Sequence, residues 1–149
     1  MFLTFDTETT GLPKNFKADV SDSDNWPRLV QLAWQLNDET GKLISNNSLI
    51  VKPEGFTIPY NSEKVHGIST EKALKEGEDL EGIIQKFEKD VKNSKYVIGH
   101  NINFDLKIIG AEHFRLSYSS NLNDKINLDT GQISKKYFNL KGVFGVGLK

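Results

Sequence analysis

The stretch Met1-Phe-Leu-Thr-Phe-Asp-Thr-Glu-Thr-Thr-Gly-Leu12 decides the fold of this 149-residue chain. Its apolar, β-prone residues 2–5 predict a strand that is buried on both faces. Asp6 and Glu8 follow directly, and residues two apart on an extended chain project from the same face. The stretch therefore predicts two neighbouring carboxylates at the carboxyl end of a central strand, before the chain turns at Gly11.

Two adjacent carboxylates repel each other, and partial burial makes their charges more costly. A shared cation offsets this repulsion, and oxygen ligands without cysteine suit hard ions such as Mg²⁺ or Mn²⁺. The alternative is a solvated strand end that carries two acids without a metal, because acidic residues are common at such positions. The pair alone leaves both interpretations open.

The composition limits the class of protein. The chain is long enough for one domain with its own core, and its 37% hydrophobic content and formal net charge of −1 are ordinary. Without cysteine it has no disulfide, thiolate metal site or cysteine nucleophile. No leader and no apolar run of about 20 residues is present, so we expect a soluble, cytoplasmic protein without a membrane partner. The balanced charge gives no broad basic footprint, so any nucleic acid would have to be bound at a local site with metal ions.

Hydrophobic patterning predicts an α/β fold, with a mixed five-stranded sheet flanked by helices. Strands are predicted over residues 2–5, 29–36, 43–51, 96–99 and 126–128, the first three as an antiparallel meander. Helices are predicted from a Ser62 cap to Gly67, from Ser69 or Thr70 to Lys75, after an Asp79 cap, over 103–114 and over 130–138. The polar loop over residues 14–28 is predicted to be a solvated insertion without a chemical role.

The string Phe-Asp-Thr-Glu-Thr-Thr-Gly-Leu at residues 5–12 resembles the first motif of the DEDD superfamily of 3′→5′ exonucleases. That superfamily includes the proofreading (epsilon) subunit of bacterial DNA polymerase III. The resemblance implies a ribonuclease H-like fold and nuclease activity. It also implies that Asp6 and Glu8 are catalytic metal ligands.

A second motif, Val-Ile-Gly-His-Asn-Ile-Asn-Phe-Asp, covers residues 97–105. A strand runs into a helix that starts near Asn103, so Asp105 falls in the first helical turn, where the helix dipole favours negative charge. Taken alone, Asp105 has the alternative role of a helix-terminal acid. The stretch resembles the second exonuclease motif, and this resemblance adds Asp105 to the catalytic and metal-binding set.

The resemblance also implies a pocket for the 3′-terminal nucleotide. The candidate substrate-binding residues are Thr7, Thr9, Leu12, His66 and Phe104. His66 has the alternative role of a capping histidine in a loop, and Phe104 that of a core side chain. His100 and Asn101 are predicted to close a strand end by hydrogen bonds, and Asp129 to cap the following helix.

The family's third motif, a histidine followed five residues later by an aspartate, has no counterpart in this sequence. In the family the histidine deprotonates the attacking water and the aspartate is the fourth metal ligand. Residues 130–149 contain no Asp, Glu or His. We therefore expect an incomplete exonuclease-like domain over residues 1–138, without its closing helix, and an irregular tail over 139–149. Truncation or a frameshift is favoured over natural loss of catalysis.

Two hypotheses follow. The first is a metal-dependent 3′→5′ exonuclease domain that acts on DNA in a proofreading-like role, with two Mg²⁺ or Mn²⁺ ions in a complete site. Activity on RNA stays open within this hypothesis, and the chain as given is expected to be inactive or weak. The second is a non-catalytic domain that binds a nucleic-acid 3′ end or a DNA polymerase subunit.

Overall fold

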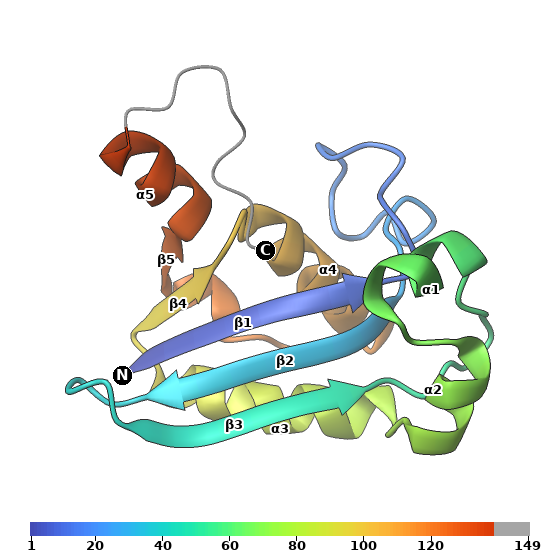
Figure 1. Ribbon diagram of the computed structural model, residues 1–149, viewed down its shortest axis with the longest axis horizontal. Helices are drawn as coiled ribbons and strands as arrows, with labels where there is room; N and C mark the ends of the chain where they lie inside the picture. The colour runs from blue at the N-terminus through green and yellow to red at the C-terminus, as the bar shows by residue number, and fades with distance from the viewer. Residues whose placement is uncertain (139–149) are drawn as a thin grey trace.

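The computed structural model describes residues 1–138, which form a mixed five-stranded sheet and its helices (Figure 1). The strands are β1 (Phe2–Thr9), β2 (Leu29–Asn37), β3 (Leu43–Ile50), β4 (Tyr96–Gly99) and β5 (Ile126–Asp129). They lie in the order β3-β2-β1-β4-β5. Strands β1 to β3 form an antiparallel meander, whereas β4 is parallel to both β1 and β5. The predicted mixed sheet and its meander are confirmed, and the predicted tail over 139–149 lies outside the described residues.

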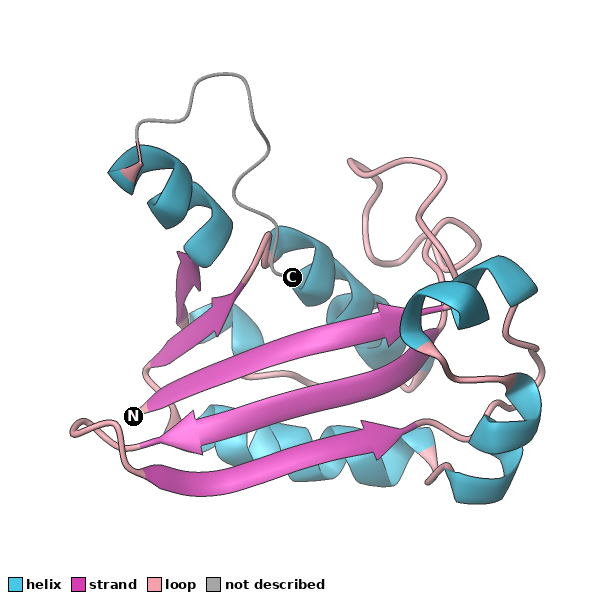
Figure 2. Cartoon of the chain, viewed as in Figure 1, coloured by secondary structure: helices cyan, strands magenta, loops and turns pink. Residues whose placement is uncertain are grey.

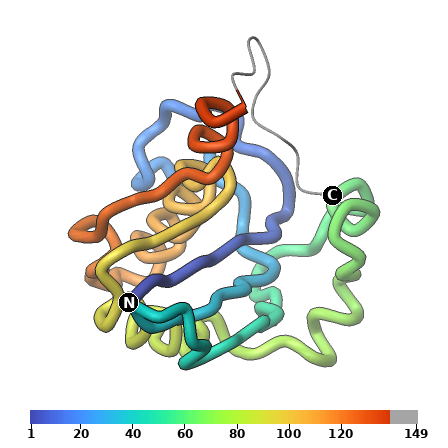
Figure 3. Tube along the Cα trace, turned by 60° about the vertical axis from the view of Figure 1, so that its left-hand side comes forward, coloured from blue at the N-terminus to red at the C-terminus, as the bar shows by residue number. Residues whose placement is uncertain are grey.

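Two long helices cover one face of the sheet (Figure 2). They are α3 (Leu80–Asn93) and α4 (Asn103–Arg115). Helices α1 (Tyr60–His66) and α2 (Thr70–Glu76) lie beside the end of the sheet at which β1 and β3 finish (Figure 1). A 3₁₀ turn (Leu122–Asp124) precedes β5, and α5 (Thr130–Tyr137) follows it at the sheet edge formed by β4 and β5 (Figure 3). None of the helices described for residues 1–138 has the length and hydropathy needed to span a bilayer.

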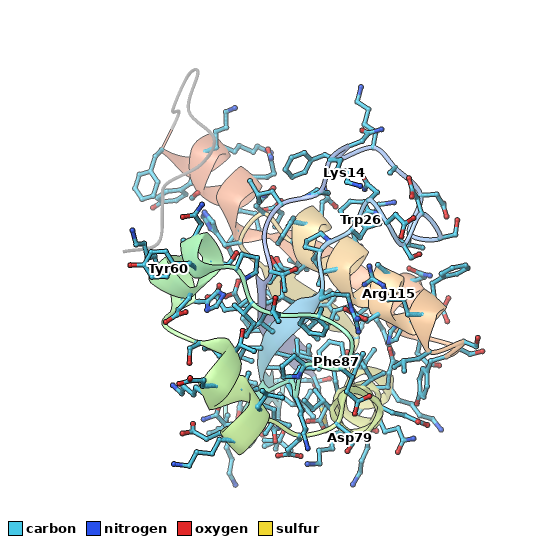
Figure 4. All side chains as sticks on the ribbon, turned by 90° about the vertical axis from the view of Figure 1, so that its right-hand side faces the viewer. Lys14, Trp26, Tyr60, Asp79, Phe87 and Arg115 are labelled. Atoms are coloured by element: carbon cyan, nitrogen blue, oxygen red, sulfur yellow. The ribbon has the colours of Figure 1, made fainter. Side chains whose placement is uncertain are left out.

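The core lies between the sheet and helices α3 and α4. Leu3 and Phe5 of β1 are at most 2% exposed and belong to the same buried cluster as Phe87 of α3. The Phe87 side chain of α3 packs against the strands (Figure 4). Its ring centroid lies 5.3 Å from that of Phe5 and 5.5 Å from that of Trp34, which it contacts edge-on. Burial of these large side chains holds β1 firmly in the centre of the sheet.

The opposite face of the sheet is open over β1 to β3 in the described part of the chain. Apart from α1 at the carboxyl end of β1, no helix of residues 1–138 lies over this face (Figure 1), and Thr4 and Gln35 on it are exposed. The prediction that residues 2–5 are buried on both faces is therefore wrong. Successive side chains of a strand alternate between faces, so that only Leu3 and Phe5 of this run reach the helical layer.

Local capping explains most helix boundaries. The side chains of Ser69, Asp79 and Asp129 accept hydrogen bonds from backbone N–H groups in the first turns of α2, α3 and α5, as predicted. The predicted Ser62 cap is wrong, because α1 already begins at Tyr60 and Ser62 is buried within it. Pro59 precedes α1 with φ fixed at −64°, and this lets the chain enter the helix earlier than a serine cap would.

Candidate active site

Strand β1 carries two of the candidate carboxylates inside the strand rather than after it. It extends four residues further than predicted, because β2 pairs with it along its length and places Ala33 opposite Asp6 and Gln31 opposite Glu8. Asp6 and Glu8 alternate with Thr7, so both carboxylates lie on one face of the sheet and Thr7 lies on the other. This agrees with exposure, since Asp6 is exposed, Glu8 is half-buried and Thr7 is buried.

The first turn of α4 brings Asp105 against β1. Its Oδ1 accepts two hydrogen bonds from Thr7, one from the backbone N–H at 3.0 Å and one from Oγ1 at 2.6 Å. The Asp105 side chain is nearly enclosed, with 3% of the residue exposed. Thr7 thus joins two segments that are 98 positions apart and holds the third carboxylate beside the strand that carries the first two.

All three carboxyl groups have raised pKa values. Burial is the main cause in each, and it raises the pKa of Asp105 to about 7 although the hydrogen bonds from Thr7 act in the opposite direction. The charge of Asp6 adds to the effect of burial on the pKa values of Asp105 and Glu8. Partial burial raises the pKa of Asp6 itself, against the backbone hydrogen bond of Thr7 and the nearby His100. Asp6 therefore repels each of the other two carboxyl groups, and a bound cation would relieve this repulsion.

The candidate ligands are all carboxylate oxygens, and oxygen ligands suit a hard divalent cation. Within residues 1–138, no three His, Asp or Glu side chains are gathered closely enough to hold an ion by themselves. Mg²⁺ is commonly bound through one or two carboxylates while water and substrate phosphates complete its coordination. An ion held here would accordingly take its remaining ligands from water or from a phosphate.

His66 lies near these carboxylates at the end of α1. Its Nδ1 accepts a hydrogen bond from the backbone N–H of Ile68 at 3.1 Å. Its Nε2 is buried and has no hydrogen-bond partner among the described residues. The ring is close enough to Glu8 to lower the pKa of that carboxyl, against the larger effects of burial and Asp6. One imidazole nitrogen of His66 thus lacks the hydrogen bond that a buried polar atom normally has, and a bound ligand would be one way to supply it.

The other candidate substrate-binding residues differ in how far their side chains are exposed. The side chains of Thr7 and Thr9 are buried, and Thr9 Oγ1 donates to the carbonyl of Gly11 at 2.7 Å. A substrate contact from either threonine would therefore have to come from its backbone. Leu12, in contrast, is 74% exposed just beyond β1, and Phe104 is half-buried in the first turn of α4.

His100 closes the end of β4, as predicted, and Asp129 adds a hydrogen bond to the same segment. His100 Nδ1 lies 3.1 Å from Thr130 Oγ1, which donates to the carbonyl of Gly99 at 3.1 Å. Since the hydroxyl hydrogen is used on Gly99, the proton between His100 and Thr130 belongs to Nδ1. Asp129 Oδ1 accepts from the backbone N–H of Asn101 at 3.0 Å and so ties the second motif to the start of α5.

The loop over residues 14–28 is fixed to the domain, and its prediction as a solvated insertion is wrong. Trp26 is 3% exposed, and its Nε1 donates to the carbonyl of Asp19 at 2.9 Å. Arg115 of α4 donates through Nη2 to the carbonyls of Ser23 and Trp26, both at 2.7 Å (Figure 4). The available signal was Trp26 itself, because a tryptophan within a polar stretch usually buries its large ring.

The strand order β3-β2-β1-β4-β5 is that of the ribonuclease H-like fold, with the candidate carboxylates on and beside its central strand. The family model described as RNase T, exonuclease, matches residues 3–143. The chain therefore belongs to this exonuclease family, within the DEDD superfamily. The particular resemblance to the epsilon subunit stays a prediction.

Solved structures of exonuclease I share this fold. The E. coli enzyme in complex with a dT13 oligonucleotide superimposes with a TM-score of 0.74 at 19% identity, covering 94% of this chain and 30% of that one. A product-bound exonuclease I gives a TM-score of 0.75 at 20% identity, with 94% and 32% covered. A complex named ExoI/SSB-Ct gives 0.74 at 19% identity, with 94% and 30% covered. The chain thus spans about a third of these proteins, and no curated protein matches it significantly in sequence.

Proposed function

We propose that this chain is a metal-dependent exonuclease domain that removes nucleotides from the 3′ end of a single strand, with DNA as its first substrate. The observation that carries the proposal is the group of Asp6, Glu8 and Asp105 around the end of β1, whose pKa values are all raised, mainly by burial. Family membership supports nuclease chemistry, and the fold is that of an enzyme solved with an oligonucleotide and with a product. The proofreading role and a polymerase partner rest only on the resemblance of the two motifs.

Each residue has a defined task in this proposal. Asp6 and Glu8 would hold one Mg²⁺ or Mn²⁺ ion, and Asp105, oriented by Thr7, would hold the other. When bound, such ions activate water and stabilise the charge that develops on the phosphodiester. His66 would contact the terminal nucleotide through its free Nε2. 

Exposed Leu12 would pack against the terminal base in this proposal, because it is a largely exposed apolar side chain that follows Glu8 by only four residues. The backbone that follows Glu8 would contact the sugar. These contacts place the last phosphodiester of the strand, rather than an internal one, next to the acidic groups. They thereby favour removal of nucleotides from an end.

A second candidate function is a non-catalytic domain that binds a nucleic-acid 3′ end. The observation in its favour is that residues 130–149 hold no Asp, Glu or His that could supply the third motif. Both functions require metal binding at Asp6, and they differ in whether a strand is cleaved.

The chain is expected to bind Mn²⁺, and Asp6→Ala is expected to weaken this binding at least about tenfold, because a lone carboxylate holds a divalent ion poorly. Isothermal titration calorimetry of the purified chain measures this. The matched control is Glu39→Ala, an exposed acid in the turn at the opposite end of β2, which should bind Mn²⁺ like the parent chain.

The same variants decide between the two functions. A 5′-labelled dT20 strand in Mn²⁺ should give a ladder of shortened products if residues leave from the 3′ end, and a parallel rU20 strand tests RNA. Weak laddering that disappears in Asp6→Ala supports the exonuclease. Mn²⁺ binding without cleavage by either protein supports the binding domain. Absence of Mn²⁺ binding by the parent chain contradicts the proposed metal site.

A further inference from the structure

A cleft separate from the three carboxylates lies between α4 and the loop over residues 14–26. Its volume is about 620 Å³, which is within the usual range for ligand pockets. The residues that line it include Phe16, Trp26, Asn101, Asn103, Phe104 and Lys107. The cleft begins beside the candidate site, because Phe104 lines it and Asp105 is the next residue of α4.

The loop forms a fixed wall of this cleft. A Cβ at Gly110 of α4 would lie 2.9 Å from Cγ1 of Val20, so the glycine is what lets the loop approach the helix this closely. Trp26 is buried where the loop meets α4, and Arg115 holds two loop carbonyls (Figure 4). The backbone N–H of Lys14 donates to the carbonyl of Asn25 at 3.3 Å and closes the base of the loop. A wall that is already ordered loses little conformational entropy when a ligand binds.

The side chains that line the cleft combine three kinds of chemistry. Phe16 is 60% exposed and Phe104 is half-buried, so both offer ring surface to a ligand. Asn101 and Asn103 are exposed amides, which can donate to and accept from the edges of bases. Lys107 supplies a cation on the same helix; its charge also acts on Asp19 of the loop, whose pKa is lowered mainly by hydrogen bonds from Ser21. Proteins that bind single-stranded nucleic acid use aromatic platforms for bases together with cations for the phosphate backbone.

We propose that this cleft binds the part of a single nucleic-acid strand that precedes its terminal nucleotide. The inference rests on the proposed function and extends it, since it assigns a path to the strand beyond the nucleotide that is removed. Bases stack on Phe16 and Phe104, and Lys107 neutralises a phosphate between them. The cleft contributes affinity without taking part in bond cleavage.

Phe16→Ala is the first test, with binding of 5′-fluorescein-labelled dT8 and rU8 in EDTA measured by fluorescence anisotropy. Loss of one stacked base should weaken binding at least about fivefold. The matched control is Phe114→Ala, which removes another exposed phenyl ring from α4 outside the cleft and should bind like the parent chain. Because Phe16 is mostly exposed, its removal should leave the urea unfolding midpoint unchanged, and this is checked on the same samples.

Lys107→Gln tests the phosphate contact through salt dependence. Each phosphate neutralised on a single strand contributes a slope of about −0.7 to log K against log salt. The variant should therefore lose about 0.7 of the slope seen with the parent chain. Lys89→Gln, at an exposed position of α3, removes an equal charge away from the cleft and should keep the slope.

Binding of dTMP in the presence of Mn²⁺ tests the candidate active site, whereas binding of the labelled strands in EDTA tests the cleft. A Phe16→Ala defect toward dT8 or rU8, with dTMP binding intact, supports the cleft. Equal binding of the labelled strands by Phe16→Ala and Phe114→Ala, with an unchanged slope in Lys107→Gln, overturns the cleft alone. Failure of the parent chain to bind either dTMP or a strand overturns both proposals.

Discussion

Replacing Glu112 by alanine is expected to destabilise the folded chain by about 3–5 kcal/mol, because it leaves the partly buried Arg28 and Arg115 without their buried counter-charge. Glu112 of α4 is 0% exposed. Its Oε1 accepts from Arg28 Nε at 3.0 Å and from the backbone N–H of Leu29 at 2.9 Å. Arg115 Nη1 lies 3.0 Å from the same oxygen. Removing the carboxylate also leaves the backbone N–H of Leu29 without its hydrogen-bond acceptor, and this further lowers the free energy of unfolding.

Urea denaturation at neutral pH measures this loss. Glu112→Gln keeps the shape of the side chain and an acceptor oxygen but not the charge, so its loss should be smaller than that of alanine. Glu78→Ala is the control, because Glu78 pairs with Lys86 on the surface and such a pair contributes less than about 1 kcal/mol. A Glu112→Ala loss no larger than that of Glu78→Ala would show that the buried network does not stabilise the fold.

The Glu112 network also connects the stability of the fold to the cleft beside the candidate site. Arg28 stands where the loop returns to β2, and its backbone N–H donates to Thr10 Oγ1 at 3.0 Å. Arg115 holds the loop carbonyls further along, at Ser23 and Trp26. One buried carboxylate thus fixes both cations that fasten the loop. Loosening of this network is expected to disorder the wall that carries Phe16.

Local sequence signals were sufficient for much of the fold. Caps such as Asp79 and Asp129 act within a few residues, so the helices they begin were predictable. The alternation on β1 placed Asp6 and Glu8 on one face, and the dipole argument placed Asp105 in the first turn of α4. These predictions depend on spacing along the chain and need no knowledge of distant partners.

What the sequence did not reveal depends on contacts between distant segments. Thr7 resembles a candidate pocket residue, but α4 covers its face of β1 and turns its hydroxyl to Asp105. Glu112 sits among the usual charged residues of a helix, and its burial follows only from the packing of α4 under Arg28. β1 was predicted to be too short because its length depends on pairing with β2 as far as Leu29. In each case the deciding energy comes from tertiary packing, which overrides local preference.

Asp105→Asn is expected to stabilise the metal-free chain by about 2–4 kcal/mol at pH 8. Burial first, and then the charge of Asp6, raise the pKa of Asp105 to about 7 from its ordinary 3.8. Between these pH values the unfolded chain has released the proton and the folded chain has kept it. The free energy of unfolding of the parent chain therefore falls as the pH rises through this window, and stays low above it. Asparagine carries no charge, and its Oδ1 can still accept both hydrogen bonds from Thr7.

The stabilisation by Asp105→Asn should be larger at high pH than at low pH. At pH 4.5, close to the ordinary pKa of an aspartate, the stabilisation should shrink to about 1 kcal/mol. Urea unfolding in EDTA at both pH values measures it, with Asp124→Asn, an exposed acid of the 3₁₀ turn, as a control that should change little at either. Equal stabilisation at both pH values would mean that the buried charge of Asp105 is not its cause.

Mn²⁺ is expected to reduce the advantage of the asparagine variant. An ion that binds only the folded chain stabilises it by about 2.7 kcal/mol at a concentration of 100 times the dissociation constant. Asp105 must lose its proton to act as a ligand, so the affinity of the parent chain for Mn²⁺ should fall as the pH drops from 8 to 6. Asp105→Asn should gain less stability from Mn²⁺ and show a weaker dependence on pH. If Asp105 had only a structural role, the variant would be more stable without the ion and would still respond to Mn²⁺ like the parent chain.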